Sequence, residues 1–492
     1  MKFEFKNCDG VLQGTLIAPV LEGMGVPPRL VREDKEETLA RAMTAQNFTG
    51  KKGEFCTVLM PTGLCVTLAG VGKPEGAVET WLQTVGGTLA TVLKSVRHKE
   101  VMICTSGLSD VKVKTATAAA YLTFGLGLGA YSFDVYKTKK KETPEVELVR
   151  ILSSDPEADE AAFESLFAVL NGVYEARDLS SEPANMLPPA EFVEAVKALK
   201  MKNVTLKVLD KKQMQKLGMN LLLTVAQGAA EAPYLLIMEY MKGKKEDAPV
   251  VLVGKGVCFD SGGMNLKPSA SLTHMKYDMS GGAAVVGTLH AVSELGLKQN
   301  VVGLVPLVEN MLSDRAAHTD DVIQSMNGKT VEIANTDAEG RLILADAMWY
   351  GQETYHPQTL IDIATLTGVM KYVFGSQYAG LFTNDKGLGS ALKKASDETV
   401  MDQIWELPLH PDYEKMLSSD IADLSNIGKG GDAGSATAAM FLKNFVADGV
   451  KWAHLDIASV GWLSADKPCA PKGATGFGVQ LLTQYFINRE NA

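Results

Sequence analysis

Hydrophobic residues in the first third of the chain form short runs of strand length, and one longer segment has apolar residues near helical spacing. The short runs are residues 14–21, 55–60, 101–106 and 146–152, and the helical segment is residues 79–96. Strands that alternate with helical patterns are typical of an α/β domain. We therefore predict an N-terminal α/β domain over residues 1–155.

A helix-like segment without strand character follows this domain. Ser154 or Asp155 is placed to cap a helix with Pro156 in its first turn, and the acidic residues that come next suit the positive end of a helix dipole. Pro183 and two later prolines interrupt the pattern. We predict a linker helix over residues 156–180.

The second half of the chain contains apolar runs that are nearly continuous rather than alternating. They cover residues 248–259, 300–310, 359–368 and 452–460. Such runs are typical of strands buried on both faces, which are mostly parallel. We predict a C-terminal catalytic domain over residues 181–492. The expected fold class is α/β, with two domains that each have a mostly parallel or mixed sheet flanked by helices.

Composition narrows the class of protein further. A chain of 492 residues is too long for one ordinary core, and its net charge of −10 gives no general attraction to nucleic acid or to an anionic membrane. Six cysteines without a C-x-x-C pair, and a start without signal-peptide character, favour a reducing compartment, so we expect a cytoplasmic protein.

Two further segments have simple expectations. The uncharged run 115–133 is long enough to cross a membrane but consists largely of Ala, Thr and Gly, so we predict a buried helix and turn instead of a span. The basic run 137–142 is predicted to be a solvated loop.

Three segments of the second domain place acidic residues beside glycines, close to the ends of apolar runs. These segments are VGKGVCFDSGGMNLKP with Lys255, Asp260 and Lys267, MKYDMSGGAAV with Asp278, and NTDAEGRL with Asp337, Glu339 and Arg341. An aspartate before a helix is most often a cap, so Asp278 alone favours a structural role. Because the carboxyl ends of parallel strands meet at one edge of a sheet, the whole set favours a functional site there.

The segment NTDAEGRL carries two carboxylates at positions i and i+2. Such positions diverge on a helix, whereas on an extended segment they project to one side, so we expect Asp337 and Glu339 to converge before the next helix begins. Gly340 is expected to let the backbone turn tightly into that helix. Clustered carboxylates repel one another, and a pair of divalent cations would compensate them with oxygen ligands.

Other familiar catalytic patterns are missing from these motifs. There is no H-E-x-x-H for a common zinc protease, no G-x-S-x-G for a nucleophilic serine, and no P-loop or G-x-G-x-x-G spacing for a nucleotide. Cys258 belongs to an apolar run, which disfavours a nucleophilic thiol.

Taken in order, these motifs resemble those of the leucyl aminopeptidases, the di-metal cytosol aminopeptidases. The resemblance rests on NTDAEGRL together with VGKGVCFDSGG, MKYDMSGGAAV, DIATLTG, WAHLDIA and KGATGFGV, and it covers residues 175–485. Cys258 stands where a threonine is common in the family.

The resemblance implies a role for each matching residue. The implied metal ligands are Lys255 as a neutral amine, Asp260, Asp278, Asp337 and Glu339. The implied catalytic residues are Lys267 and Arg341, and the implied substrate-binding residues are Met275, Thr365, Leu366 and Gly368.

The resemblance also implies the activity and the partners. We expect a metal-dependent aminopeptidase that removes Leu- or Met-like residues from the N-terminus of peptides, as a homohexamer. Two divalent ions, Mn or Zn with Mg and Co as further options, would activate water, and a bicarbonate at Arg341 would act as the base. Two alternatives remain at this point: another two-metal hydrolase such as a phosphoesterase, and an additional DNA-binding role.

Overall fold

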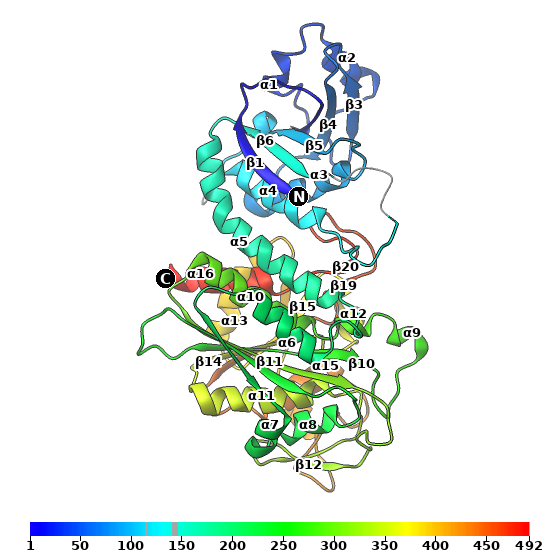
Figure 1. Cartoon of the computed structure of the whole chain (residues 1–492), viewed down its shortest axis with the longest axis vertical. Helices are drawn as coiled ribbons and strands as arrows, with labels where there is room; N and C mark the ends of the chain where they lie inside the picture. Colours follow the sequence, from blue (N-terminus) through cyan, green and yellow to red (C-terminus); the bar gives the residue numbers. More distant parts are fainter. Residues whose placement is uncertain (114–116, 140–145, 492) are drawn as a thin grey trace. The chain divides into compact units, whose positions relative to one another are not determined.

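The computed structural model describes residues 1–113, 117–139 and 146–491. It divides the chain into two compact units. The first unit contains Met1–Leu170 and Ala465–Pro471, and the second contains Asn171–Ser464 and Lys472–Ala492. The segment expected to be a linker helix forms α5 (Pro156–Ser181). Asp155, directly before this helix, accepts a hydrogen bond from the amide of Ala158 at 3.1 Å. Both units are α/β, as predicted (Figure 1).

The first unit is built on a six-stranded sheet. Its strand order is β1 (Lys2–Asn7), β6 (Leu148–Ser153), β5 (Glu100–Cys104), β2 (Thr15–Leu21), β4 (Cys65–Gly72) and β3 (Phe55–Leu59). Neighbouring strands are parallel except for the pair β3 and β4. The other elements are α1 (Pro28–Val31), α2 (Thr38–Ala45), α3 (Val78–Leu93), η1 (Thr105–Leu108) and α4 (Ala118–Ala130).

The uncharged run expected to be a buried helix forms α4, whose packing depends on glycine. A Cβ on Gly125 would lie 1.9 Å from the carbonyl oxygen of Gln83, and one on Gly86 would lie 1.9 Å from that of Leu122. The two helices α3 and α4 can therefore approach closely only because both positions lack side chains. Residues 115 and 116 of this run lie outside the described residues.

We expect a solvated loop at the basic run 137–142 and no membrane span at the uncharged run 115–133. In the basic run 137–142, residues 137–139 are exposed, as expected for a solvated loop, and residues 140–142 lie outside the described residues. Across the described ranges, none of the helices has both the length and the apolar character that crossing a membrane requires.

The second unit is built on a nine-stranded mixed sheet. The strand order is β16 (Ile404–Glu406), β15 (Ala379–Thr383), β18 (Lys451–Asp456), β14 (Thr359–Ala364), β9 (Val250–Gly254), β11 (Asn300–Asn310), β8 (Tyr234–Met241) and β7 (Val204–Leu209), with β10 (Gly256–Asp260) beside β11. The central strands β18, β14, β9 and β11 are parallel. Their carboxyl ends therefore form one edge, where a site is expected.

The single strand predicted over 248–259 is wrong, because the chain forms two strands separated at Lys255. β9 pairs with both β14 and β11, whereas β10 pairs further along β11. At the break, the amide of Lys255 donates to the carbonyl of Ile363 at 3.1 Å, and its carbonyl accepts from Gly282 at 2.8 Å. The amide of Lys255 thus still bonds to β14, whereas its carbonyl bonds to the first turn of α10, and its side chain is directed to other partners.

Helices cover both faces of this sheet (Figure 1). One face carries α10 (Ser280–Leu295), α13 (Lys386–Asp397) and α16 (Val479–Glu490), and the other carries α11 (Gly340–Tyr355), α8 (Asn220–Ala226) and α15 (Gly434–Lys443). Between α11 and the strands lies a core in which Val251, Leu304 and Ile343 are fully buried. Two of the helices that cover the sheet, α10 and α11, begin at its carboxyl edge.

The remaining elements of the second unit are short. The helices are α6 (Pro189–Ala198), α7 (Lys211–Leu217), α9 (Ser269–Leu272), η2 (Met275–Tyr277), α12 (Met370–Phe374) and α14 (Pro411–Lys415). The strands are β12 (Val322–Gln324), β13 (Thr330–Glu332), β17 (Leu424–Ser425), β19 (Trp462–Leu463) and β20 (Gly473–Ala474).

Candidate metal centre

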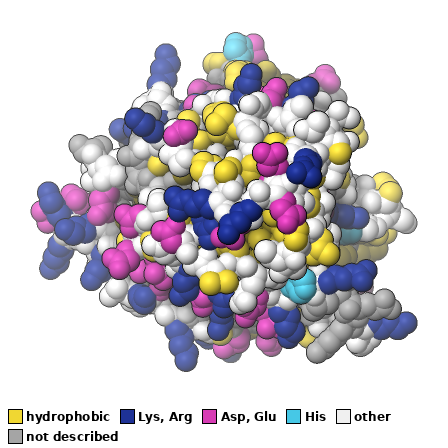
Figure 2. Space-filling view, turned by 90° about the horizontal axis from the view of Figure 1, so that it is seen from above, with side chains coloured by type: hydrophobic (Ala, Val, Ile, Leu, Met, Phe, Trp, Pro, Cys, Tyr) yellow, Lys and Arg dark blue, Asp and Glu magenta, His cyan; other side chains and the backbone are white. Residues whose placement is uncertain are grey.

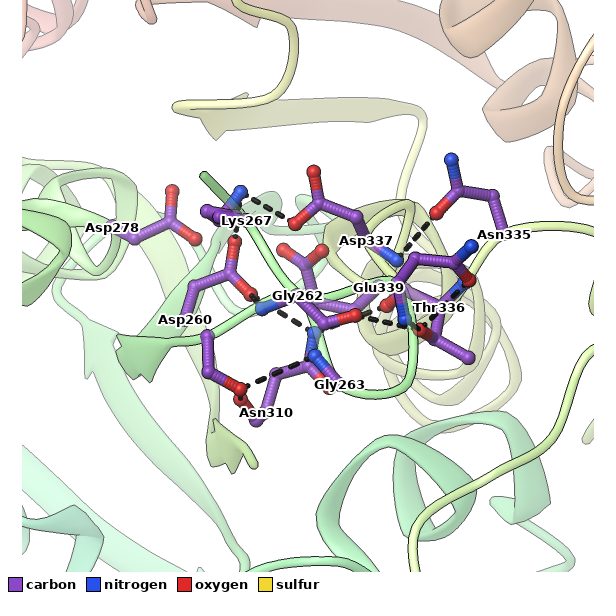
Figure 3. Close-up of polar contacts among 12 residues, drawn as sticks. Asp260, Gly262, Gly263, Lys267, Asp278, Asn310, Asn335, Thr336, Asp337 and Glu339 are labelled. Carbon is purple, nitrogen blue, oxygen red and sulfur yellow. Dashed lines mark hydrogen bonds and ion pairs between the residues drawn. The ribbon is translucent and has the colours of Figure 1, made fainter. Parts of the chain in front are cut away.

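Four carboxylates from three segments of the second unit meet at the carboxyl edge of its sheet (Figure 3). Asp260 is the last residue of β10, and Asp278 follows η2 just before α10. Asp337 and Glu339 precede α11. Three of these side chains are buried, and that of Asp337 is one-third exposed. The structure thus brings together the acidic residues that the three sequence motifs contain.

Two lysines divide these carboxylates into two pairs. The Nζ atom of Lys255 lies 2.8 Å from Asp278 Oδ2 and 2.8 Å from Glu339 Oε1. The Nζ atom of Lys267 lies 2.7 Å from Asp260 Oδ2 and 2.5 Å from Asp337 Oδ1. Lys255 is only 3% exposed, and it also donates a hydrogen bond to the carbonyl of Thr365 at 3.0 Å. Two ammonium groups therefore supply positive charge that the four buried or half-buried acids need.

Burial disturbs the titration of this cluster. Desolvation, with a further contribution from Asp260, raises the pKa of Glu339 to about 8. Burial raises the pKa of Asp278 to about 6 against the lowering effect of Lys255, and burial also raises the pKa of Asp337. For Lys255, burial lowers the pKa, but the neighbouring carboxylates outweigh it and the net shift is upward.

These residues fit a divalent metal ion. Within the described part of the chain, Asp278 Oδ2, Asp337 Oδ1 and Glu339 Oε2 are buried and accept no hydrogen bond of standard geometry, although the first two form the ion pairs with lysine. Oxygen atoms of Asp260, Asp337 and Glu339 all lie within 4.8 Å of one another. Buried carboxylate oxygens with unused acceptor capacity are the ligands that hard divalent cations prefer.

The expected extended conformation of NTDAEGRL is wrong, although its two carboxylates do converge. The amide of Asp337 donates to Asn335 Oδ1 at 2.7 Å, and the amide of Ala338 donates to the Asn335 carbonyl at 3.2 Å, so the segment makes a turn. Glu339 already has helical dihedrals, with φ −79° and ψ −36°, as the N-cap of α11. The asparagine-centred turn, and not strand alternation, brings the carboxylates together.

The role expected for Gly340 also differs in the structure. Gly340 is the first residue of α11 and has no positive φ. A Cβ at this position would lie 2.6 Å from Cε and 2.9 Å from Nζ of Lys255. A side chain here would therefore push Lys255 away from its present position, because the lysine passes over the first turn of the helix.

Arg341 is buried beside the carboxylates. One of its terminal nitrogens, Nη1, donates to the carbonyl of Asn426 at 2.7 Å, while its Nε–H has no hydrogen-bond partner within the described residues. Burial lowers the pKa of Arg341 to about 10, and Glu339 acts in the opposite direction. A buried guanidinium with an unused donor is suited to a small anion.

Of the residues expected to bind substrate, Thr365 contacts this centre directly. Thr365 donates from Oγ1 to Asp278 Oδ1 at 2.7 Å, and the amide of Leu366 donates to Asp456 Oδ1 at 3.3 Å. Met275 is half-buried in η2, and the space around a Cβ at Gly368 is open for 4 Å. Cys258 is buried, and burial raises the pKa of its thiol, which argues against a nucleophile.

Residues that the motifs did not single out hold the carboxylates in place. Asn310, Thr336 and Asn265 form hydrogen bonds among the segments that carry Asp260 and Asp337. A signal for Asn310 is present in the sequence, since this amide ends an apolar strand at the same sheet edge. A second signal is the polar pair Asn335 and Thr336 directly before Asp337.

A buried group of acids and lysines at the carboxyl edge of a mixed sheet, with the carboxylate oxygens that a divalent cation prefers, is typical of a metal-dependent enzyme of the α/β class. Comparison of the sequence with known protein families narrows this class to one family. The profile described as "Cytosol aminopeptidase family, catalytic domain" matches residues 174–483, and the profile of the N-terminal domain of the same family matches residues 23–140.

Similar proteins span the full length of the chain. A probable cytosol aminopeptidase of Caulobacter vibrioides is 43% identical and covers 98% of this chain and 98% of its own length. The cytosol aminopeptidase of Rickettsia prowazekii is 39% identical, with 99% of each chain covered.

Two solved structures have a similar fold over nearly the whole chain. A mutant of tomato leucine aminopeptidase has a TM-score of 0.88 at 29% identity and covers 99% of this chain and 96% of its own. The bottromycin maturation enzyme BotP in complex with Mn has a TM-score of 0.83 at 29% identity, with 97% and 99% covered.

The chain belongs to the cytosol aminopeptidase family. It is a metal-dependent aminopeptidase, a metallo-exopeptidase that acts on peptides, so the resemblance inferred from the motifs is confirmed. Family membership does not favour the phosphoesterase or the DNA-binding alternative.

Proposed function

We propose that five side chains hold two divalent ions in this enzyme: Lys255, Asp260, Asp278, Asp337 and Glu339. The observation that carries the proposal is the buried carboxylate cluster. Within the described residues, Glu339 Oε2 accepts no hydrogen bond, and Asp278 Oδ2 and Asp337 Oδ1 face only lysine ammonium groups. Mn and Zn are the favoured ions, with Mg and Co as further options for mixed oxygen and amine ligands. The complex of BotP with Mn supports Mn in particular.

When bound, divalent ions polarise a carbonyl group and lower the pKa of water. Lys267 is proposed to stabilise the oxyanion that forms during peptide hydrolysis. The carboxylates around Lys267 outweigh the effect of its burial and raise its pKa, which keeps the ammonium protonated and able to donate a hydrogen bond. The preorganised position of Nζ between Asp260 and Asp337 directs this donor into the site.

Arg341 is proposed to bind a bicarbonate that acts as the general base. A guanidinium does not lose its proton in proteins, so Arg341 cannot be the base itself. Its unused Nε–H lies in a buried position, where a charge-assisted hydrogen bond to a small anion is strong. Arg341 would hold this anion beside the carboxylates, where it would supply the general-base chemistry that the side chains of the site do not supply.

The substrates are proposed to be peptides with a free N-terminus and a Leu- or Met-like first residue. Met275, Thr365 and Gly368 would line the pocket for that side chain, and Leu366 would contact the peptide backbone. The half-buried methionine and the open space at Gly368 support a medium-sized apolar side chain. The hydrogen bond from Thr365 to Asp278 would keep this pocket next to the metal centre.

We further propose a cytoplasmic homohexamer, in keeping with the family resemblance and with relatives named cytosol aminopeptidase. Light scattering of the purified protein measures the oligomeric state directly. A role in nucleic-acid binding is not proposed. The face in Figure 2 shows Lys and Arg side chains among acidic and hydrophobic ones, and the net charge of the chain is −10.

The double variant Asp337→Asn with Glu339→Gln tests the proposal. We expect it to lose bound metal and to hydrolyse Leu-amide at least ~100-fold more slowly, because it removes two ligand charges. A matched control is Asp397→Asn with Glu353→Gln, two exposed positions, which should retain both properties. Metal analysis and assays with Leu-amide and an aryl phosphate are the measurements. Full metal content together with full Leu-amide hydrolysis in the double variant would refute the assignment.

A further inference from the structure

Asn310, the last residue of β11, joins the two segments that supply carboxylates from β10 and from the turn before α11 (Figure 3). Its Nδ2 donates to Asp260 Oδ1 at 2.9 Å and to the carbonyl of Thr336 at 3.0 Å. Its own carbonyl accepts from the amide of Ser261 at 2.9 Å and from Ser261 Oγ at 2.7 Å. Asn310 is only 4% exposed, so these bonds do not compete with bulk water.

A second set of hydrogen bonds closes the same connection. Thr336 Oγ1 donates to the carbonyl of Gly262 at 2.6 Å, and the amide of Asn265 donates to Thr336 Oγ1 at 2.8 Å. The amide of Thr336 donates to Asn265 Oδ1 at 2.8 Å. The segment 260–265 is therefore held to the segment 335–337 at several points, and Asn310 contacts both.

The effect on Asp260 is specific to one of its oxygens. Oδ1 accepts from Asn310 Nδ2 at 2.9 Å and from the amide of Gly262 at 2.9 Å, whereas Oδ2 is the atom that faces Lys267 at 2.7 Å. Two donors on Oδ1 fix the rotation of the carboxylate. Oδ2 is left directed toward the lysine that also contacts Asp337.

We propose that Asn310 is a positioning residue of the metal centre, which orients Asp260 and sets the separation between the Asp260 and Asp337 segments. The inference rests on the proposed function, because it takes both aspartates as metal ligands. Partners that orient metal ligands contribute about 10–100-fold to metal affinity. The same hydrogen bonds would keep the acids close together before a metal arrives, at the cost of their mutual repulsion.

Only a side chain with two donors on one nitrogen satisfies this position. The two atoms that Nδ2 meets, Asp260 Oδ1 and the Thr336 carbonyl, are both acceptors. Aspartate has the same shape but would place an acceptor against both of them, with a second negative charge beside Asp260. An apolar residue would leave buried acceptors without partners.

The test compares Asn310→Asp with Asn300→Asp at the opposite end of the same strand. Asn300 is a matched control because its Nδ2 also donates twice, to the carbonyls of Lys244 at 2.7 Å and Asp247 at 2.9 Å. Metal-free full-length protein is titrated with Mn²⁺ by calorimetry. We expect Asn310→Asp to weaken Mn²⁺ binding by about 10–100-fold and Asn300→Asp to leave it within about 2-fold.

A double-mutant cycle separates positioning from a general structural effect. Asn310→Ser is a milder change, for the case in which Asn310→Asp does not fold. Its effect on Mn²⁺ affinity is measured in the natural sequence and in an Asp260→Asn background. If Asn310 acts through Asp260, most of its effect on Mn²⁺ affinity should disappear in that background. An undiminished effect, or Mn²⁺ binding by folded Asn310→Asp equal to that of the natural protein, would overturn the positioning role alone. Failure of the natural protein to bind Mn²⁺ and to hydrolyse Leu-amide would overturn the proposed function as well.

Discussion

At the scale of single residues, the candidate metal centre balances the burial of its carboxylates against the charge of its lysines. Each of the two lysines contacts two carboxylates within 2.8 Å, and the environment raises the pKa of both lysines and of three of the acids. Protonated lysine can neutralise a carboxylate but cannot bind a cation. The charge balance of the metal-free protein therefore differs from the one that a metal would require, and protons must leave when a metal binds.

This difference makes metal binding depend on pH in a defined direction. Glu339 has a pKa of about 8 and Asp278 of about 6, so both are increasingly protonated as the pH falls from 8 to 6. Deprotonated forms bind the metal, and the raised pKa of Lys255 acts in the same direction. We expect Mn²⁺ affinity to increase steadily from pH 6 to pH 8, with protons released on binding. Calorimetry in buffers of different ionisation enthalpy measures both, and an affinity that does not change over this range would contradict the prediction.

At the scale of elements, the sequence predicts which segments meet but not the local conformation that brings the charges together. The strand ends near Asp260 and Asn310 follow from apolar runs alone. The break between strands at Lys255 does not follow from the apolar run, because it depends on how β9 and β10 both pair with β11. The turn at Asp337 and the absence of a side chain at Gly340 likewise depend on contacts with Asn335 and Lys255 that pattern and spacing do not reveal.

The contact between Gly340 and Lys255 gives a sharp prediction about the start of α11. Alanine favours a helix more than glycine, so Gly340→Ala should preserve or strengthen α11 itself. Its Cβ, however, would lie 2.6 Å from Lys255 Cε and must displace the lysine from Asp278 and Glu339. We expect at least a ~10-fold loss of Mn²⁺ affinity and of Leu-amide hydrolysis, comparable to the loss of an orienting partner.

Gly434→Ala is the control for this change, because Gly434 also begins a helix, α15. A Cβ added there would meet no described atom within 4 Å beyond its chain neighbours and the nearby backbone of its own helix. It should retain metal affinity and activity. If Gly340→Ala kept both at the natural level, the steric role of this glycine would be wrong.

At the scale of the whole molecule, the candidate metal centre belongs to one of the two compact units. All its residues lie between Lys255 and Arg341, within the second unit, and they come from both faces and the edge of the nine-stranded sheet. A cation held there links β10, α10 and α11, which are separate in sequence. The free energy of cation binding should therefore add to the unfolding free energy of the second unit.

Removal of the metal should therefore destabilise the second unit and leave the first unit almost unchanged. At a free Mn²⁺ concentration of 100 times Kd, the gain in unfolding free energy is about 2.7 kcal/mol. At one fixed free Mn²⁺ concentration, the gain should be larger at pH 8 than at pH 6, because Kd is expected to be smaller at pH 8. Because the pKa values of Asp278 and Glu339 are raised, the metal-free folded protein binds more protons than the unfolded chain between the ordinary carboxyl pKa and about pH 8. The unfolding free energy of the metal-free protein therefore falls as the pH rises through this range. Four of the five tryptophans (Trp349, Trp405, Trp452 and Trp462) lie in the second unit, so tryptophan fluorescence during urea unfolding, with Mn²⁺ or with EDTA, reports this unit. A fluorescence transition that does not move with Mn²⁺ at pH 8 would show that the acidic cluster does not bind the ion in the folded protein.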